Sequence, residues 1–193
     1  MTKTGDKIVF GWKHYMPAQK DMWKQCFPDD EDEFVEFYFR EVYSRNNTLV
    51  YLKGKEPVAA LQMIPFTLNS NGKTYTASYL SGVMTRPDSR RKGYISKLIL
   101  RSLKIMSRRG CAYSILMPQE LWLFDFYKQF GFKTCEDVES NTVLNITDKY
   151  LWIVQDDFLG ITDTTWTGMI KRIDDNAPEV NAMQINIISK KHI

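Results

Sequence analysis

The sequence has 193 residues and a net charge of +3; 44% of the residues are hydrophobic and 25% are charged. A chain of this length and composition can bury a substantial core as one domain, or one domain with an appendage, which excludes intrinsic disorder. No apolar run is long enough to span a membrane, and the first ten residues lack a signal-peptide core. The three cysteines are far apart and form no C-x-x-C pair, so we expect reduced thiols in a cytoplasmic protein that does not bind membranes.

Charge is distributed unevenly along the chain. Residues 86–109 contain nine Lys or Arg and one acid, whereas residues 29–41 contain seven acids and one base. The two stretches could serve one anionic and one cationic partner. Each pattern is equally typical of a solvated helix face, so charge alone does not decide between these interpretations.

The N-terminal part of the chain predicts two helices. Residues 18–27 form a short helix that Pro28 closes. A second helix follows over residues 29–43, with Asp29 or Asp30 as its N-cap and acids in its first turn, where the helix dipole favours them. Its inward face is expected to hold Phe34, Phe37, Tyr38 and Val42.

Three β-like runs come next. Residues 48–54 and 57–68 are joined by a short Gly-containing turn, which is typical of a hairpin. The pair Asn71–Gly72 is a turn signal, and residues 74–85 then form a third strand. We expect these three strands to be antiparallel.

The next part of the chain predicts helices that alternate with strands. A helix begins at Gly93 and ends at Gly110, and residues 111–117 form a buried strand parallel to the one before this helix. A further helix starts at Pro118 and ends at Gly131. The buried stripe of the first of these helices is expected to comprise Ile95, Leu98, Ile99, Leu103 and Met106.

Beyond residue 140 the pattern is less regular. Residues 141–146 and 183–189 are typical of strands, whereas residues 150–170 fit either a helix or a strand. Trp152 and Trp166 in this region suggest packing or a partner surface. A domain boundary near residue 145 is consistent with this change of pattern.

The stretch RRKGYISKLILR, residues 90–101, places three bases and a glycine at the start of a helix. Backbone N–H groups at a helix N-terminus favour an anion, and the glycine permits close approach of a ligand. A pyrophosphate fits this arrangement better than a carboxylate. Neither G-x-x-x-x-G-K-[ST] nor G-x-G-x-x-G occurs, which disfavours a P-loop and a dinucleotide-binding fold.

Two motifs together resemble the GCN5-related N-acetyltransferase (GNAT) superfamily. GVMTRPDSRRKGYISKLI is similar to its coenzyme A pyrophosphate motif R/Q-x-x-G-x-G/A, and FYKQFGF to its later helix. The resemblance covers roughly residues 5–140 and departs at Ile95, where the superfamily usually has Gly or Ala. TRPDSRRKGYI is most similar to the Eis-type group, which acetylates aminoglycosides and other amines and carries much more chain after the catalytic domain.

The resemblance implies a mixed α/β fold. Its twisted, mostly antiparallel sheet has a central splayed parallel strand pair and is flanked by helices. Residues 1–145 would form the acetyl-CoA-binding catalytic domain, and residues 146–193 would complete it or begin a missing second domain. Tyr127 would donate a proton to the leaving thiolate. The implied acetyl-CoA-binding residues are Val83, Met84 and Thr85 for the pantetheine arm and Arg90, Arg91, Lys92, Gly93, Tyr94, Ile95 and Ser96 for the pyrophosphate.

The implied activity is acetyl-CoA-dependent N-acetylation of a primary amine of a small cationic molecule or peptide, by direct attack in a ternary complex. A non-catalytic CoA-binding sensor or scaffold of the same fold is the alternative. Nucleic-acid binding through the basic stretch is disfavoured because no reading motif occurs, and a homo-oligomer is left open. No metal site is expected, since His14 and His192 are isolated.

Several roles stay open. Tyr127 could simply pack beside Phe124, Phe126 and Phe130, and the strand at Val83 to Thr85 could be an ordinary ladder. The candidates for the general base are Glu33, Glu36, Glu120, a water chain, or the C-terminal carboxylate of Ile193.

Overall fold

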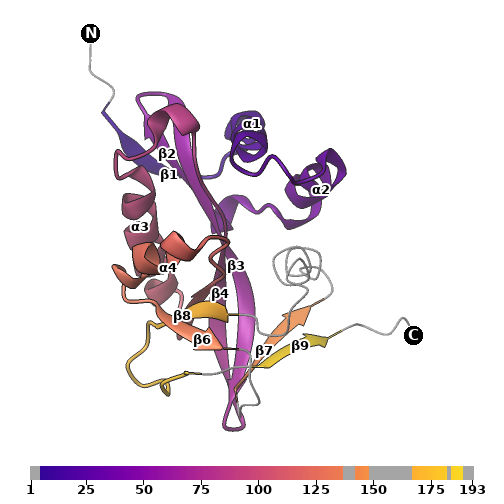
Figure 1. The fold of residues 1–193 in the computed structure, drawn as a ribbon, viewed down its shortest axis with the longest axis vertical. Helices are drawn as coiled ribbons and strands as arrows, with labels where there is room; N and C mark the ends of the chain where they lie inside the picture. Colours follow the sequence, from indigo (N-terminus) through magenta and orange to yellow (C-terminus); the bar gives the residue numbers. More distant parts are fainter. Residues whose placement is uncertain (1–4, 137–141, 148–166, 182–183, 189–193) are drawn as a thin grey trace. The chain divides into compact units, whose positions relative to one another are not determined.

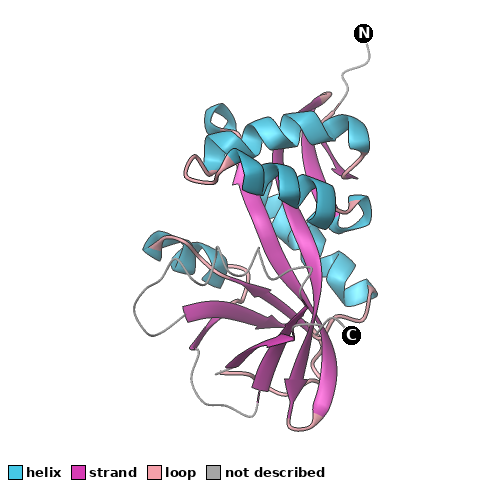
Figure 2. Cartoon of the chain, turned by 90° about the vertical axis from the view of Figure 1, so that its right-hand side faces the viewer, coloured by secondary structure: helices cyan, strands magenta, loops and turns pink. Residues whose placement is uncertain are grey.

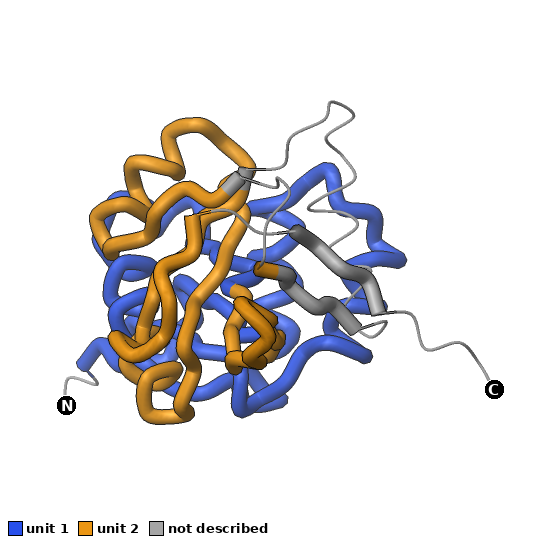
Figure 3. Tube along the Cα trace, turned by 90° about the horizontal axis from the view of Figure 1, so that it is seen from below, with its two compact units in different colours: residues 1–64, 80–102 blue, residues 65–79, 103–193 orange. Residues whose placement is uncertain are grey.

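The computed structural model describes residues 5–136, 142–147, 167–181 and 184–188. The chain divides into two compact units (Figure 3), which are described one at a time. Unit 1 comprises Met1–Ile64 and Leu80–Ser102, and unit 2 comprises Pro65–Tyr79 and Leu103–Ile193.

The sheet of unit 1 begins with an antiparallel ladder at the N-terminus. Strand β1 (Lys7–Phe10) pairs with β2 (Thr48–Lys53), and β2 pairs with the first part of β3 (Glu56–Ser70). A bulge interrupts the β2–β3 register between Tyr51 and Leu52. The hairpin of β2 and β3 confirms the prediction, whereas β1 was not expected.

Helices cover both faces of the strands of unit 1. Helices α1 (Met16–Cys26) and α2 (Asp32–Phe37) lie on one side, and α3 (Tyr94–Arg108) begins on the other (Figure 1). Figure 2 is turned so that the side of α1 and α2 faces the viewer, and both helices lie in front of the strands. Short 3₁₀ turns at Lys13–Tyr15, Arg45–Asn47 and Pro87–Ser89 complete this part of the chain.

Helix α2 differs in two ways from the prediction. Its N-cap is Glu31, not Asp29 or Asp30, because Glu31 is the last residue with extended backbone. A π-helical turn, Tyr38–Val42, continues the helix. The buried stripe therefore differs from the predicted one. Two predicted members, Phe34 and Phe37, are only half-buried. The residues that are buried on this helix and its π-helical turn are Val35, Tyr38, Phe39 and Val42.

Helix α3 buries much of its predicted stripe. Leu98, Ile99 and Met106 are fully buried, whereas Ile95 and Leu103 are half-buried. The other buried positions on this helix are Tyr94, Ser102 and Ile105.

In unit 2, the end of β3 and the start of β4 (Lys73–Thr85) form a hairpin. Its turn residues Asn71 and Gly72 both have positive φ, 50° and 75°, which is the geometry that an Asn-Gly turn favours. Strand β5 (Tyr113–Leu116) pairs in parallel with β4, as predicted.

The remaining strands of unit 2 come from the C-terminal part of the chain. Strand β8 (Thr167–Arg172) lies between β5 and β6 (Lys133–Glu136), antiparallel to both. Strand β7 (Thr142–Thr147) pairs antiparallel with β3 and parallel with β9 (Gln184–Ile188). The mixed α/β fold with a mostly antiparallel sheet and a parallel β4–β5 pair is thus confirmed.

Helix α4 (Leu121–Lys128) starts later than predicted. Pro118 precedes it by three residues, and Glu120 is its N-cap with an extended backbone (φ −131°, ψ 144°). Of the ambiguous stretch at residues 150–170, only residues 167–170 are described, and they belong to β8. Trp152, Trp166 and His192 lie outside the described residues.

Candidate active site

The loop between β4 and α3 presents backbone amides in an unusual conformation. Arg91 and Gly93 both lie in the left-handed region, with φ of 61° and 73°. The first hydrogen bond of the helix runs from the amide of Lys97 to the carbonyl of Gly93, at 3.2 Å. The amides just before Lys97 consequently have no acceptor within the helix, and with its dipole they form a setting that favours an anion.

Contacts within the loop hold this conformation. Arg86 Nε donates to Asp88 Oδ1 at 2.7 Å, and Ser89 Oγ donates to the same oxygen at 2.9 Å. The Arg86 guanidinium is the main reason that the pKa of Asp88 lies below its ordinary value, with the Ser89 hydroxyl second. Lys92 Nζ donates to the carbonyl of Asp88 at 2.9 Å, which closes the loop from its other side.

The three bases of the loop have different environments. Arg90 folds back: its Nε donates to the carbonyl of Thr85 at 3.3 Å, and its guanidinium lies 3.7 Å from Cys26 Sγ. Lys92 is bonded to the loop itself. Arg91 is exposed, and within the described part of the chain its side chain has no ion pair or hydrogen bond. Among these bases, Arg91 is therefore the one most available to an anion.

The first helical residues contribute backbone rather than side chains. Tyr94 is buried, and its ring lies 4.5 Å from the ring of Tyr51 between centroids. Ile95 and Ser96 are half-buried. Within unit 1 the structure thus brings the predicted residues from Arg90 to Ser96 together on one loop and helix start.

The end of β4 loses its parallel partner before the predicted pantetheine residues. The register with β5 runs from Ala77 to Tyr79 and ends there, although β4 continues to Thr85. Met84 is buried, whereas Val83 and Thr85 are half-buried.

Gly82 is a feature of this strand that sequence reasoning missed. It has a φ of +54° in the strand interior, and a Cβ built there would lie 2.6 Å from Cζ3 of Trp23. An isolated glycine within a strand pattern was the available signal, since it marks a bulge or a close approach.

Tyr127 lies on α4 and belongs to unit 2, whereas the loop before α3 belongs to unit 1. Its side chain is 5% exposed, and its ring contacts those of Phe126 and Phe132, with centroids 5.2 and 5.9 Å away. Phe132 was not among its predicted neighbours, and Phe126 was. Burial raises the pKa of Tyr127 above its ordinary value, so the phenol keeps its proton at neutral pH.

The candidate bases carry contacts that the sequence did not show. Glu36 Oε2 forms an ion pair with Lys20 Nζ at 2.5 Å, and Glu120 Oε2 accepts a hydrogen bond from Trp122 Nε1. Glu33 is exposed on the first turn of α2. Ile193 lies outside the described residues.

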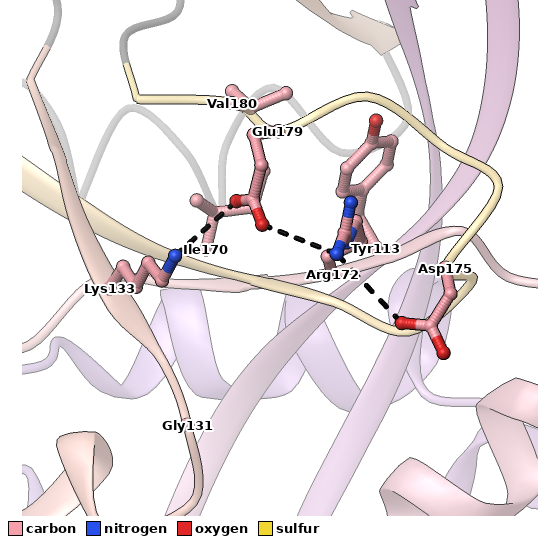
Figure 4. A pocket seen from close by; sticks show the side chains of 8 residues that line it. All are labelled: Tyr113, Gly131, Lys133, Ile170, Arg172, Asp175, Glu179 and Val180. Atoms are coloured by element: carbon pink, nitrogen blue, oxygen red, sulfur yellow. Dashed lines mark hydrogen bonds and ion pairs between the residues drawn. The ribbon is translucent and has the colours of Figure 1, made fainter.

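A separate cavity of about 160 Å³ lies in unit 2 (Figure 4). Glu179 bridges Lys133 at 3.4 Å and Arg172 at 3.3 Å, and Asp175 lies 3.9 Å from Arg172. The charges at this cavity are therefore paired with one another, and we assign them a structural role. Its lining residues are Tyr113, Gly131, Lys133, Ile170, Arg172, Asp175, Glu179 and Val180.

Two features are absent from the described ranges. No group of three or more His, Cys, Asp or Glu side chains there could hold a metal ion. None of the described helices combines the length and apolarity that crossing a bilayer requires.

Comparison with solved structures identifies the fold. A GCN5-related N-acetyltransferase from Anabaena variabilis superposes with a TM-score of 0.60 at 18% identity, over 68% of this chain and 34% of that one. Eis1 from Mycobacterium abscessus gives 0.56 at 15%, over 68% and 32%. A GNAT family acetyltransferase from Brucella melitensis, in complex with acetyl-CoA, gives 0.55 at 17%, over 67% and 84%. The chain thus spans about a third of the length of the first two.

No curated protein matches the chain. The profile of the acetyltransferase (GNAT) domain matches residues 12–135, which is more than half of the sequence. This range includes β2 to β5, the loop that precedes α3, and all of α4. The chain belongs to the GNAT acetyltransferase family.

Proposed function

We propose that this protein is an N-acetyltransferase that moves the acetyl group of acetyl-CoA to a primary amine. The observation that carries the proposal is the loop before α3, where left-handed Arg91 and Gly93 accompany backbone amides that have no acceptor within the helix. Family membership and the acetyl-CoA complex of the Brucella melitensis relative support the same donor. The pyrophosphate would bind to these amides and to the Arg91 guanidinium.

The reaction requires three contributions from the chain. Val83 to Thr85 would hold the pantetheine arm as an added strand, which the early end of the β4–β5 pairing supports. A backbone amide there would stabilise the oxyanion that forms when the amine nitrogen attacks the thioester carbon. As the C–S bond breaks, Tyr127 would give its proton to the thiolate sulfur, and the proton that the amine nitrogen loses would return to the tyrosinate through water. Burial raises the pKa of Tyr127, so the phenol holds a proton at neutral pH.

We infer that the acceptor is a small cationic molecule or peptide, as in the Eis-type group. The loop sequence TRPDSRRKGYI and the fold likeness to Eis1 support this assignment. Lys24 and Lys20 neutralise Asp32 and Glu36. Arg40 pairs with Glu41, so the exposed acids of residues 29–41 for which the described residues show no ion pair are Asp29, Glu31 and Glu33. We propose that these attract the amine.

We also propose that residues 146–193 complete the domain formed by residues 1–145. The position of β8 between β5 and β6 supports this, because the sheet of unit 2 would lack a central strand without it. The three cysteines are free thiols, which supports a reducing compartment such as the cytoplasm.

A CoA-binding sensor or scaffold without turnover is the second candidate. The observation in its favour is that Glu36 and Glu120, two of the candidate bases, are already bonded to Lys20 and Trp122. A base in such contacts is less available to an attacking amine.

Turnover decides between the two candidates. The protein is incubated with acetyl-CoA and a panel of polyamines, aminoglycosides and lysine peptides, and the released CoA thiol is measured with a thiol reagent. Thiol release that depends on the amine supports the enzyme. Saturable acetyl-CoA binding with no release across the panel would favour the sensor, and absence of binding would contradict both.

A further inference from the structure

Strand β4 bends immediately before the segment Val83–Thr85. Gly82 takes a φ of +54°, which a residue with a side chain rarely adopts, and such a residue within a strand displaces the backbone from regular pairing. The direction of Val83–Thr85 therefore depends on what holds this bend.

The indole of Trp23, on α1, lies directly against the bend. A Cβ on residue 82 would stand 2.6 Å from Cζ3 and 3.3 Å from Cη2 of this ring. Trp23 is itself buried, so the ring has little room to withdraw. The ring and a side chain at position 82 exclude each other.

Other groups fix the ring in this position. Trp23 Nε1 donates to Asp30 Oδ2 at 2.5 Å, and the ring centroids of Tyr38 and Phe27 lie 4.4 and 5.1 Å from that of Trp23. The hydroxyl of Tyr38 donates to Ser81 Oγ at 3.0 Å. One aromatic cluster thus contacts both Gly82 and the residue before it.

Helix α1 also reaches the other end of the segment. Cys26 follows Trp23 by three residues, a spacing that places both on one face of a helix. Its Sγ donates to the carbonyl of Thr85 at 3.3 Å. The face of α1 that carries Trp23 and Cys26 therefore holds Gly82 and Thr85, which flank the backbone groups of Val83 and Met84.

We propose that Trp23 and Cys26 are positioning residues that preset the Val83–Thr85 backbone for the pantetheine arm. The inference rests on the proposed function, since it presumes that acetyl-CoA lies along this segment. The two residues act through the backbone of β4, and we assign neither a contact with the reacting atoms.

The test compares two ligands on the Trp23→Leu variant. Acetyl-CoA reaches both the loop and the strand, whereas its nucleotide half, adenosine diphosphate carrying a 3′-phosphate, reaches the loop alone. Loss of one or two backbone hydrogen bonds predicts that the Kd for acetyl-CoA rises about tenfold, with the Kd for the nucleotide unchanged. Trp12→Leu, which alters a tryptophan 44% exposed to solvent, is the matched control and should change neither value.

A second pair of variants keeps the test decisive if Trp23→Leu does not fold. Cys26→Ala removes the thiol contacts with the Thr85 carbonyl and with the Arg90 guanidinium, which keeps its own bond to the Thr85 carbonyl. It should raise the acetyl-CoA Kd about threefold without affecting the nucleotide. Gly82→Ala should likewise weaken acetyl-CoA binding without affecting the nucleotide, because its Cβ would meet the Trp23 ring.

The outcomes separate this inference from the proposed function. If the wild type binds both ligands and the variants weaken both equally, or neither, Trp23 and Cys26 do not position the strand. If the folded wild type binds neither ligand, the proposed function fails, and the inference fails with it.

Discussion

Replacing Tyr127 by Phe tests the proposed proton donor. The change removes one hydroxyl and leaves the ring contacts with Phe126 and Phe132 in place. Among the described residues the hydroxyl has no hydrogen-bond partner, and burial alone raises its pKa. Removing a buried hydroxyl without a partner is neutral or slightly stabilising, so we expect no loss of Tm.

The expected effect on catalysis is large. A general acid contributes about 10²- to 10⁴-fold, so kcat should fall by at least about 100-fold, or roughly 3 kcal/mol of barrier, while the Kd for acetyl-CoA stays the same. Initial rates of thiol release give kcat, and calorimetric titration gives Kd.

Tyr113→Phe is the matched control for this substitution. Tyr113 is also a buried tyrosine of unit 2, but its hydroxyl donates to the carbonyl of Pro178 at 2.8 Å. We expect Tyr113→Phe to lose about 1 kcal/mol of stability and to keep kcat. A folded Tyr127→Phe variant with unchanged kcat would refute the proposed role of Tyr127.

Three further predictions concern the loop and the pH dependence. Gly93→Val should weaken acetyl-CoA binding about tenfold, because a residue with a side chain pays about 1–2 kcal/mol to adopt the φ of 73° found here. Gly110→Val is the control: Gly110 has a φ of 74° and equally open surroundings, so this change should lower Tm without changing the Kd. Arg86 holds the pKa of Asp88 down, so the contact between Arg86 and Asp88 persists at neutral pH and is lost as the pH falls through that lowered value. Asp88→Asn should therefore weaken acetyl-CoA binding at pH 7 and remove the acid dependence of the Kd. Equal pH profiles of the wild type and the variant in calorimetric titrations would contradict this prediction. Burial raises the pKa of Tyr113 to about 12, so the unfolding free energy should fall as the pH rises above about 10, the ordinary tyrosine value; denaturant titrations of Tyr113→Phe should show less of this fall.

Local patterns predicted the elements that depend on local chemistry. The Asn71–Gly72 turn formed as expected, because both residues tolerate positive φ. Strand β5 was recognised as a buried strand parallel to β4, since an apolar run after a helix has few other placements. The four residues of β1 carry too little pattern to be recognised, and their pairing with β2 alone defines them as a strand.

Features that depend on tertiary contacts were not predictable. Gly82 resembles any strand glycine until Trp23, 59 positions earlier, is placed against it. Arg90 and Arg91 are neighbouring bases in the sequence. The structure distinguishes them, because Arg90 contacts the Thr85 carbonyl and Cys26, whereas Arg91 has a left-handed backbone. The bonds of the candidate bases likewise involve partners that no motif indicates.

The central claim is that the loop before α3 binds the pyrophosphate of acetyl-CoA. Isothermal titration of the wild-type chain with acetyl-CoA tests it most directly, with dephospho-CoA, which keeps the pyrophosphate, and free pantetheine, which lacks it, as comparison ligands. We predict saturable binding in the micromolar range that dephospho-CoA largely retains and that is lost with pantetheine. A folded sample that takes up no heat with acetyl-CoA, or that binds pantetheine equally well, would contradict the claim.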